Sequence, residues 1–90
     1  MPFVLICRDK PGALQIRLDT RAAHLDYIAE TGVVAQAGPF LDDAGKMCGS
    51  LLILTVDTRA AAQDWAANDP YAVAGLFAEV TVQEWKKVIG

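Results

Sequence analysis

The sequence has few of the residues that build metal centres and disulfide frameworks. It contains one histidine, His24, and two cysteines, Cys7 and Cys48, which form no CxxC pair. A zinc site would need carboxylates to complete it, and two buried apolar thiols are the simpler interpretation. We therefore expect no metal, no cofactor and no disulfide.

The chain also lacks a basic cluster and a long apolar run. Its net charge is -3, its pI is about 4.8, and its eight Lys and Arg residues are scattered. This pattern disfavours nucleic acid and anionic membranes as partners. No apolar run reaches the roughly 18 residues of a membrane span, and the start "MPFVLICRDKPG" does not resemble a signal peptide. We expect a cytoplasmic protein that binds neither nucleic acid nor membrane.

Apolar residues, in contrast, are abundant. They make up 53% of the 90 residues, and charged residues make up 21%. We expect one domain over residues 1–90, and a chain of this size buries only about 60 to 65% of its unfolded surface. The apolar excess therefore predicts an unusually large core or a surface that a partner buries.

Hydrophobic periodicity predicts the element order β, α, β, β, α, β. The run "FVLICR" is apolar on both faces, the loop "LDDAGKMCG" joins two apolar runs as a hairpin, and the last strand alternates with a period of two. We expect strands at residues 3–8, 33–40, 50–56 and 76–83, and helices at residues 20–31 and 57–68.

Capping residues set the predicted helix boundaries. Thr20 is a suitable N-cap for the first helix, and Gly32 is a suitable C′ residue. The second helix would begin after Asp57 or Thr58, and it would end before Pro70, because proline disfavours α geometry at the residue ahead of it.

This order is that of the ferredoxin-like α+β sandwich. Right-handed crossovers place both helices on one face of a four-stranded antiparallel sheet, which leaves the other face open. The first and third strands are nevertheless apolar at nearly every position. We therefore predict a homodimer that packs sheet on sheet through this open face, as a dimeric α+β barrel.

His24 and Asp69 are candidate site residues, although each has a structural interpretation. His24 lies at the margin of the helical stripe formed by Leu25 and Ile28, where it is either a half-buried, locally satisfied residue or a general acid or base. Asp69 followed by Pro70 is a typical start of a short helix. The stretch "NDPYAVAGL" is nevertheless longer than a helix-to-strand connection requires, which leaves room for a function.

The combination of motifs is more specific than any single residue. The segments "RDKPGALQIR", "RAAHLDYI", "VVAQAGPFLDDAGKMCGSLLI" and "DPYAVAGLFAEVTVQEW" occur in the order and spacing of the YciI-like (YCII-related) family, which the chain resembles over almost its whole length. The resemblance implies a dimeric ferredoxin-like fold whose pocket is marked by His24 and Asp69. Ser50 and Arg21 also match the family pattern.

Three functions fit these residues. The first is a cofactor-independent acid–base enzyme, of lyase, isomerase or dehydrochlorinase type, in which a His24–Asp69 dyad acts on a small molecule held by Arg21, Ser50 and Tyr71. Ser50 would be a hydrogen-bonding group, because no GxSxG elbow is present. The second is a non-catalytic dimer that binds a small metabolite. The third is a structural dimer whose His and Asp serve packing. This third function is disfavoured, because burying a polar pair lowers stability unless the pair is used or fully hydrogen-bonded.

Overall fold

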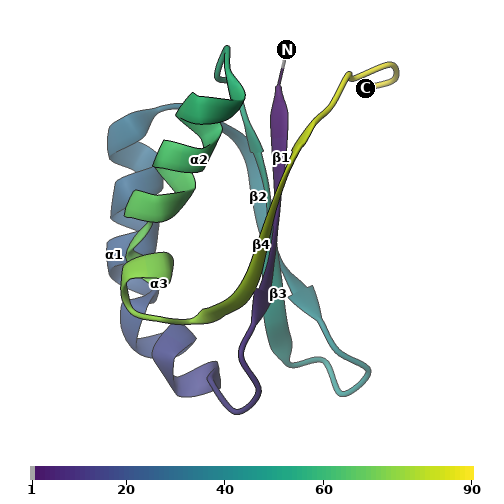
Figure 1. Ribbon diagram of the computed structural model, residues 1–90. Helices are drawn as coiled ribbons and strands as arrows, with labels where there is room; N and C mark the ends of the chain where they lie inside the picture. The colour runs from purple at the N-terminus through teal and green to yellow at the C-terminus, as the bar shows by residue number, and fades with distance from the viewer. Residues whose placement is uncertain (1) are drawn as a thin grey trace.

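The structure, a computed structural model, describes residues 2–90 as a four-stranded antiparallel sheet with helices on one face (Figure 1). The sheet order is β2-β3-β1-β4, which is the ferredoxin-like α+β arrangement predicted from the sequence. The elements are β1 (Phe3–Asp9), α1 (Leu14–Thr31), β2 (Val34–Leu41), β3 (Met47–Leu54), α2 (Arg59–Asn68), α3 (Pro70–Val73) and β4 (Phe77–Glu84).

Helix α1 begins earlier than predicted. Its first residue is Leu14, whereas the sequence suggested a start at Thr20. The N-cap position is Ala13, whose side chain cannot cap, so the usual signal for a helix start is missing. The predicted end is correct: Gly32 adopts the left-handed conformation with φ 65°, and its N–H donates to Ile28 O at 3.3 Å.

The hairpin between β2 and β3 is tighter than the predicted nine-residue loop "LDDAGKMCG". The two strands extend to Leu41 and back from Met47. Asp42 stabilises the short turn, because its Oδ1 accepts hydrogen bonds from the N–H groups of Ala44 and Lys46, both at 2.9 Å. Residues at both ends of the predicted loop therefore belong to the strands. Strand β3 starts before the predicted residue 50 and ends before the predicted residue 56.

Helix α2 begins after Thr58, whose side chain accepts a hydrogen bond from Ala61 N at 3.1 Å, so Thr58 and not Asp57 is the cap. Strand β4 follows the predicted alternation except at its start. There the register against β1 shifts between Arg8 and Asp9, so that Phe77 lies opposite Asp9. This irregularity turns Phe77 toward the helices, although simple alternation would have placed it on the outer face.

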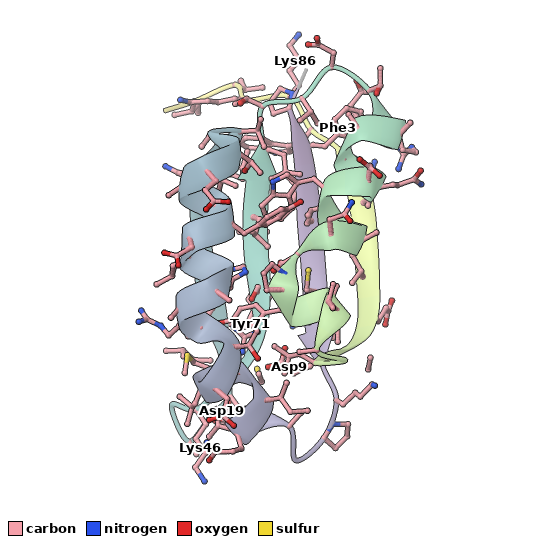
Figure 2. The ribbon with its side chains drawn as sticks, turned by 90° about the vertical axis from the view of Figure 1, so that its left-hand side faces the viewer. Phe3, Asp9, Asp19, Lys46, Tyr71 and Lys86 are labelled. Atoms are coloured by element: carbon pink, nitrogen blue, oxygen red, sulfur yellow. The ribbon has the colours of Figure 1, made fainter. Side chains whose placement is uncertain are left out.

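The core lies between the sheet and the helices, where Figure 2 shows side chains filling the space between the two layers of Figure 1. Tyr27 of α1 and Trp65 of α2 bring the helices together over it, with ring centroids 4.8 Å apart. Their polar atoms are satisfied, because Tyr27 Oη donates to Trp65 O at 2.8 Å and Trp65 Nε1 donates to Thr31 Oγ1 at 2.9 Å. The buried residues of the cluster are Phe3, Leu5, Cys7, Leu52, Leu54, Ala62 and Trp65.

No helix covers the opposite face of the sheet within residues 2–90 (Figure 1). The pairing register places Val4 opposite Ile53 and Ile6 opposite Leu51 on that open face. It is therefore apolar at its centre, in agreement with the doubly apolar runs in the sequence. Across the same described residues, no helix has both the length and the apolar character that crossing a membrane requires.

Candidate active site

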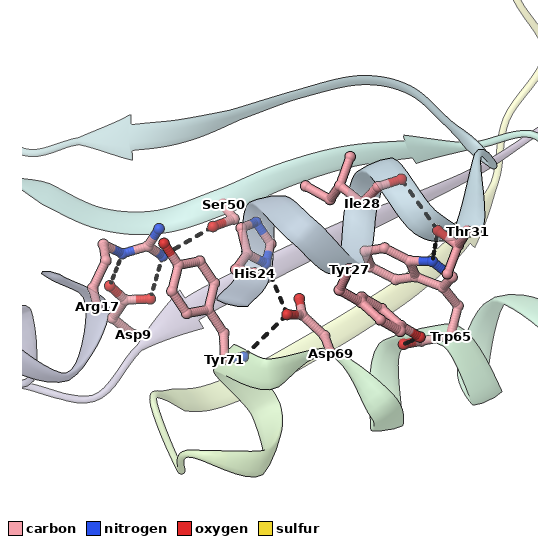
Figure 3. Close-up of polar contacts among 10 residues, drawn as sticks. All are labelled: Asp9, Arg17, His24, Tyr27, Ile28, Thr31, Ser50, Trp65, Asp69 and Tyr71. Carbon is pink, nitrogen blue, oxygen red and sulfur yellow. Dashed lines mark hydrogen bonds and ion pairs between the residues drawn. The ribbon is translucent and has the colours of Figure 1, made fainter. Parts of the chain in front are cut away.

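Buried polar side chains are concentrated in one place in this protein. Among residues 2–90, the buried polar or charged residues are Arg17, His24, Ser50 and Asp69, which are between 2% and 6% exposed. They come from α1, β3 and the α2–α3 junction, and Figure 3 shows them facing one another between the helices and the sheet. Burying four such groups together is costly unless they are satisfied or used.

Helical spacing explains why α1 supplies two of them. Arg17 and His24 are seven residues apart, which is close to two full turns, so they share one face of the helix. Arg21 lies between them on the adjacent turn, and its side chain is exposed. On the sheet, Ser50 pairs with Cys7 and points toward the helices, and Asp9 ends β1 on the same face.

His24 and Asp69 form a buried hydrogen-bonded pair. His24 Nδ1 lies 2.8 Å from Asp69 Oδ1. An ionised carboxylate only accepts hydrogen bonds, so Nδ1 carries the proton and donates it. In the neutral ring this leaves Nε2 with a free lone pair, which is the arrangement that a general base needs. The catalytic role of the pair stays a prediction.

Asp69 has a second, structural role. It is extended, with φ -60° and ψ 129°, as expected for the residue before Pro70, and it separates α2 from α3. The same Oδ1 that contacts His24 also accepts a hydrogen bond from Tyr71 N at 3.0 Å. Asp69 is therefore the N-cap of α3 as well as the hydrogen-bond partner of His24, and its role as a site residue stays a prediction.

Arg17 is held by Asp9 and Ser50 on the other side of the site. Its Nε and Nη2 donate to the two carboxylate oxygens of Asp9, each at 2.8 Å, and Nη2 also donates to Ser50 Oγ at 2.9 Å. Burial lowers the pKa of the Arg17 guanidinium, but the hydrogen bonds and charge of Asp9 outweigh this effect and raise it overall. Arg17 is thus a fixed cation inside the protein.

Tyr71 connects the two halves of the site. Its ring stacks on that of His24, with centroids 3.9 Å apart and planes inclined by 19°, and the Arg17 guanidinium carbon lies 4.8 Å from its centroid. Burial raises the pKa of the Tyr71 phenol, while the charges of Arg17 and Arg21 oppose this shift. The phenol therefore remains protonated at neutral pH.

A cavity of about 170 Å³ lies beside these residues. One wall is polar and contains Arg17, Arg21, His24, Ser50 and Tyr71. The remaining wall is apolar and is contributed by α1, β2 and β3; it consists of Leu25, Ile28, Ala37, Gly38, Pro39, Met47 and Leu52. A concave site with a few convergent polar groups is typical of small-molecule binding.

One polar atom beside this cavity has no hydrogen-bond partner within residues 2–90. His24 bonds to Asp69 through Nδ1, and its Nε2 makes no hydrogen bond to another group of the described chain. No fully buried side-chain nitrogen or oxygen in that part of the chain lacks a partner, so Nε2 retains some exposure. Since the His24 side chain lines the cavity, this atom is available to a ligand, whereas the Arg17 guanidinium interacts with Asp9, Ser50 and Tyr71.

The structure places all five predicted site residues together, because His24, Arg21, Ser50 and Tyr71 line the cavity and Asp69 contacts His24. Sequence reasoning missed Arg17 and Asp9. Arg17 lies seven residues before His24, and this spacing was the signal that could have identified it.

Cys7 lies close to these groups but offers no reactive thiol. Its side chain is 2% exposed, and burial together with the charge of Asp69 raises the pKa of the thiol to about 12. Within residues 2–90 no group of three or more His, Cys, Asp or Glu side chains is arranged to hold a metal ion.

The protein is a ferredoxin-like α+β domain with a buried His–Asp pair beside a small cavity. Comparison with known proteins identifies its family. The sequence profile of the YCII-related domain matches residues 1–86. Protein YciI of Escherichia coli is 36% identical over 97 aligned residues, which cover 98% of this chain and 99% of that protein. An uncharacterized protein of Haemophilus influenzae is 35% identical with the same coverage. The chain belongs to the YCII-related domain family, as the sequence motifs indicated.

Solved structures agree with this assignment. The 5-chloro-2-hydroxyhydroquinone dehydrochlorinase TftG from Burkholderia phenoliruptrix, in complex with 2,5-dihydroxybenzoquinone, superposes with a TM-score of 0.86. It is 37% identical to this chain, and the alignment covers 96% of this chain and 94% of TftG. An antibiotic biosynthesis monooxygenase, with a TM-score of 0.55 and 14% identity over 96% of this chain and 98% of its own, shares the fold alone.

Proposed function

We propose that this protein is a cofactor-independent acid–base enzyme that removes a proton from a small cyclic substrate, in a lyase, isomerase or dehydrochlorinase type of reaction. His24 is the general base, and Asp69 holds its ring in the tautomer that leaves Nε2 free. One observation carries the proposal: the buried Nδ1–Oδ1 contact of 2.8 Å in a histidine whose other nitrogen faces a cavity.

The cavity fits a substrate of one ring. Its volume of about 170 Å³ is close to that of an engineered cavity of about 150 Å³ that binds benzene. The apolar wall suits the faces of a planar ring, whereas Arg17, Ser50 and Tyr71 suit oxygen substituents on its edge. A polymer or a large cofactor would not fit within this volume.

The relationship to TftG supports the same class of substrate. TftG is a dehydrochlorinase of a chlorinated hydroxyhydroquinone, and it binds 2,5-dihydroxybenzoquinone. Identity of 37% over nearly the whole of both chains makes a related proton abstraction a reasonable proposal for this protein. The reaction that follows proton removal, elimination or isomerisation, depends on whether the substrate carries a leaving group.

We further propose that the active form is a homodimer that buries the open sheet face. The apolar pairs Val4–Ile53 and Ile6–Leu51 support this assembly, because a solvated sheet face normally carries polar residues. A shallow hollow of about 470 Å³ lies on the same face near Phe40, lined almost entirely by apolar residues and without a charged side chain. It suits a packing surface better than a reaction site.

A turnover assay with 5-chloro-2-hydroxyhydroquinone and related chlorinated hydroquinones tests the proposal, with chloride release and ultraviolet absorbance as readouts. His24→Gln should lower kcat by about 100- to 10,000-fold, the usual contribution of a general base. Glu30→Gln is the matched control, because Glu30 lies on the same helix and is exposed. Tight binding of these ring compounds with no turnover would instead support the metabolite-binding alternative.

A further inference from the structure

The cavity beside the His–Asp pair has two chemically different ends. Three of its lining residues follow one another along α1, and Figure 3 shows Arg17 at one end, His24 in the middle and Ile28 toward the other end. The helical rise separates Ile28 from His24 by about 6 Å along the axis, and Arg17 from His24 by about 10 Å in the opposite direction. A ring bound against His24 therefore meets a cation on one side and an apolar side chain on the other.

The sheet repeats this division along β3. Ser50 is paired with Pro39 of β2, and Leu52 is paired with Ala37. Directly paired side chains lie on the same face of a sheet, so Ala37 faces the helices together with the fully buried Leu52. Two residues of a strand span about 6.5 Å, which is close to the distance between opposite substituents of a benzene ring. Leu52 thus lies about one substituted ring beyond Ser50, on the side of the core cluster against which Ile28 packs.

Ala37 determines how much space the apolar end contains. It lies on the edge strand β2 and is exposed, although its side chain faces the helices, because it lines the cavity. Its side chain is a single methyl group, whereas Ile28 and Leu52 are large and branched. The whole cavity of about 170 Å³ is only a little larger than one that binds benzene, so a ring leaves space for one small substituent. A larger residue at position 37 would occupy that space without displacing the packed core.

We infer that Ile28, Ala37 and Leu52 form an apolar subsite for one uncharged substituent of the substrate ring, and that Ala37 limits this substituent to about the size of chlorine or a methyl group. The substrate class is a hydroxylated six-membered ring that carries such a group on the side away from Arg17. This inference rests on the proposed function and names the substrate preference of the same site.

The charge distribution of the cavity supports an uncharged substituent. Its two arginines, Arg17 and Arg21, both precede His24 on α1, on the side away from Ile28. A carboxylate at the apolar end would lose its hydration without gaining a hydrogen-bond donor, which is unfavourable. Chlorine and methyl groups lose no hydrogen bonds when they leave water, and their burial against Ile28 and Leu52 is favourable.

Calorimetric binding of ring compounds that differ in one substituent tests the subsite without relying on turnover. The probes are hydroquinone, chlorohydroquinone, tert-butylhydroquinone and 2,5-dihydroxybenzoate, handled without oxygen to keep the rings reduced. Chlorohydroquinone should bind the wild-type protein about 3- to 10-fold more tightly than hydroquinone, because it buries one additional methyl-sized group. The tert-butyl and carboxylate compounds should bind at least about 10-fold more weakly than chlorohydroquinone, the first for steric reasons and the second because of its charge.

Ala37→Val fills the subsite from the sheet side, and valine is well suited to a strand. It should weaken chlorohydroquinone binding by about 10-fold or more and change hydroquinone binding by less than about 3-fold, so that the preference disappears. Gln36→Val is the matched control, because Gln36 is the preceding residue of β2 and is paired with Ile53 on the opposite face. It should leave every Kd within about 2-fold of the wild-type value.

Ile28→Ala enlarges the subsite from the helix side. It should strengthen the binding of tert-butylhydroquinone by about 10-fold or more, because the removed carbons make room for the larger group. Ile28 also packs against the core, so Ile28→Val serves as a milder variant that should shift the preference in the same direction. Circular dichroism and melting temperature establish that each variant is folded before its Kd values are compared.

Four results would overturn the subsite. They are absence of probe binding to the wild-type protein, equal affinity for hydroquinone and chlorohydroquinone, an equal loss in Gln36→Val and Ala37→Val, and tighter binding of 2,5-dihydroxybenzoate than of chlorohydroquinone. Failure of the enzyme proposal looks different. In that case chlorohydroquinone would still be preferred, and Ala37→Val would still remove the preference, but no tested ring compound would be turned over.

Discussion

The double role of Asp69 predicts that two substitutions at this one position will have different effects. Asp69→Ala removes the oxygen that accepts both Tyr71 N–H and His24 Nδ1–H. Asp69→Asn keeps an oxygen in the same place and removes only the charge. The first variant should therefore lose stability, whereas the second should retain most of it and lose catalysis.

The magnitudes follow from the contacts. Loss of an Asp N-cap costs about 1 kcal/mol. A buried histidine donor left without its acceptor adds about 1 to 3 kcal/mol, because Asp69 and His24 are 2% and 6% exposed. Asp69→Ala should thus lose about 2 to 4 kcal/mol, which corresponds to a fall in melting temperature of roughly 8 to 30 °C for a domain of this size.

Asp69→Asn should lose less than about 1 kcal/mol, because asparagine caps helices as well as aspartate does. Its effect on kcat should be about 100- to 10,000-fold, since the neutral amide removes the negative charge that stabilises the imidazolium formed when His24 takes the proton. Comparing the loss of stability with the loss of kcat in the two variants therefore separates the structural role of Asp69 from its proposed catalytic role.

Thermal and urea unfolding at one fixed protein concentration measure the first effect, because dimerisation would otherwise shift the transition. Chloride release or absorbance change under saturating substrate measures the second. An Asp69→Ala protein as stable as the wild type would refute the structural argument. An Asp69→Asn protein with normal kcat would refute the dyad.

Three further predictions concern other parts of the fold. Gly49→Ala should destabilise the protein by about 1 to 3 kcal/mol in urea unfolding, because its Cβ would collide with the carbonyl oxygen of Cys7 and lie 3.0 Å from the Phe40 ring; unchanged stability would contradict this tight contact. At pH 8 a disulfide reagent should modify one thiol of the native protein, the partly exposed Cys48, and two after denaturation, because the Cys7 pKa of about 12 leaves about one thiolate in 10,000; equal reactivity would contradict the burial of Cys7. Leu51→Glu should convert a dimer into a monomer in sedimentation at micromolar concentration, and a dimer that survives it would place the interface elsewhere.

The sequence predicts the architecture well because the signals for it are local. Apolar runs and glycine-bearing turns define the four strands, and their order is enough to select the ferredoxin-like sheet. The errors lie where a local signal was absent or misleading. Ala13 carries no capping side chain, so the start of α1 was displaced to Thr20, and the irregular pairing at Asp9 reverses the direction of Phe77.

Arg17 and Asp9 were missed for a different reason. A lysine or arginine is rarely buried, so an arginine on a helix is normally assigned to the solvent side. Its burial here depends on a carboxylate at the end of β1 and a hydroxyl on β3, which lie 8 and 33 residues away in the sequence. Only the sheet register brings Asp9 and Ser50 to the same face, so the ion pair could not be derived before that register was known.

Asp69 shows the limit of local reasoning most clearly. The sequence offered two interpretations of "NDPY", a helix start and a site residue, as if they were alternatives. In the structure one carboxylate oxygen makes the contacts that both interpretations require, since Oδ1 lies 3.0 Å from Tyr71 N and 2.8 Å from His24 Nδ1. The cap fixes the carboxylate in the position where it meets the histidine, so the structural signal is also the means of preorganising the site. A capping motif next to a candidate histidine is therefore no argument against the proposed function.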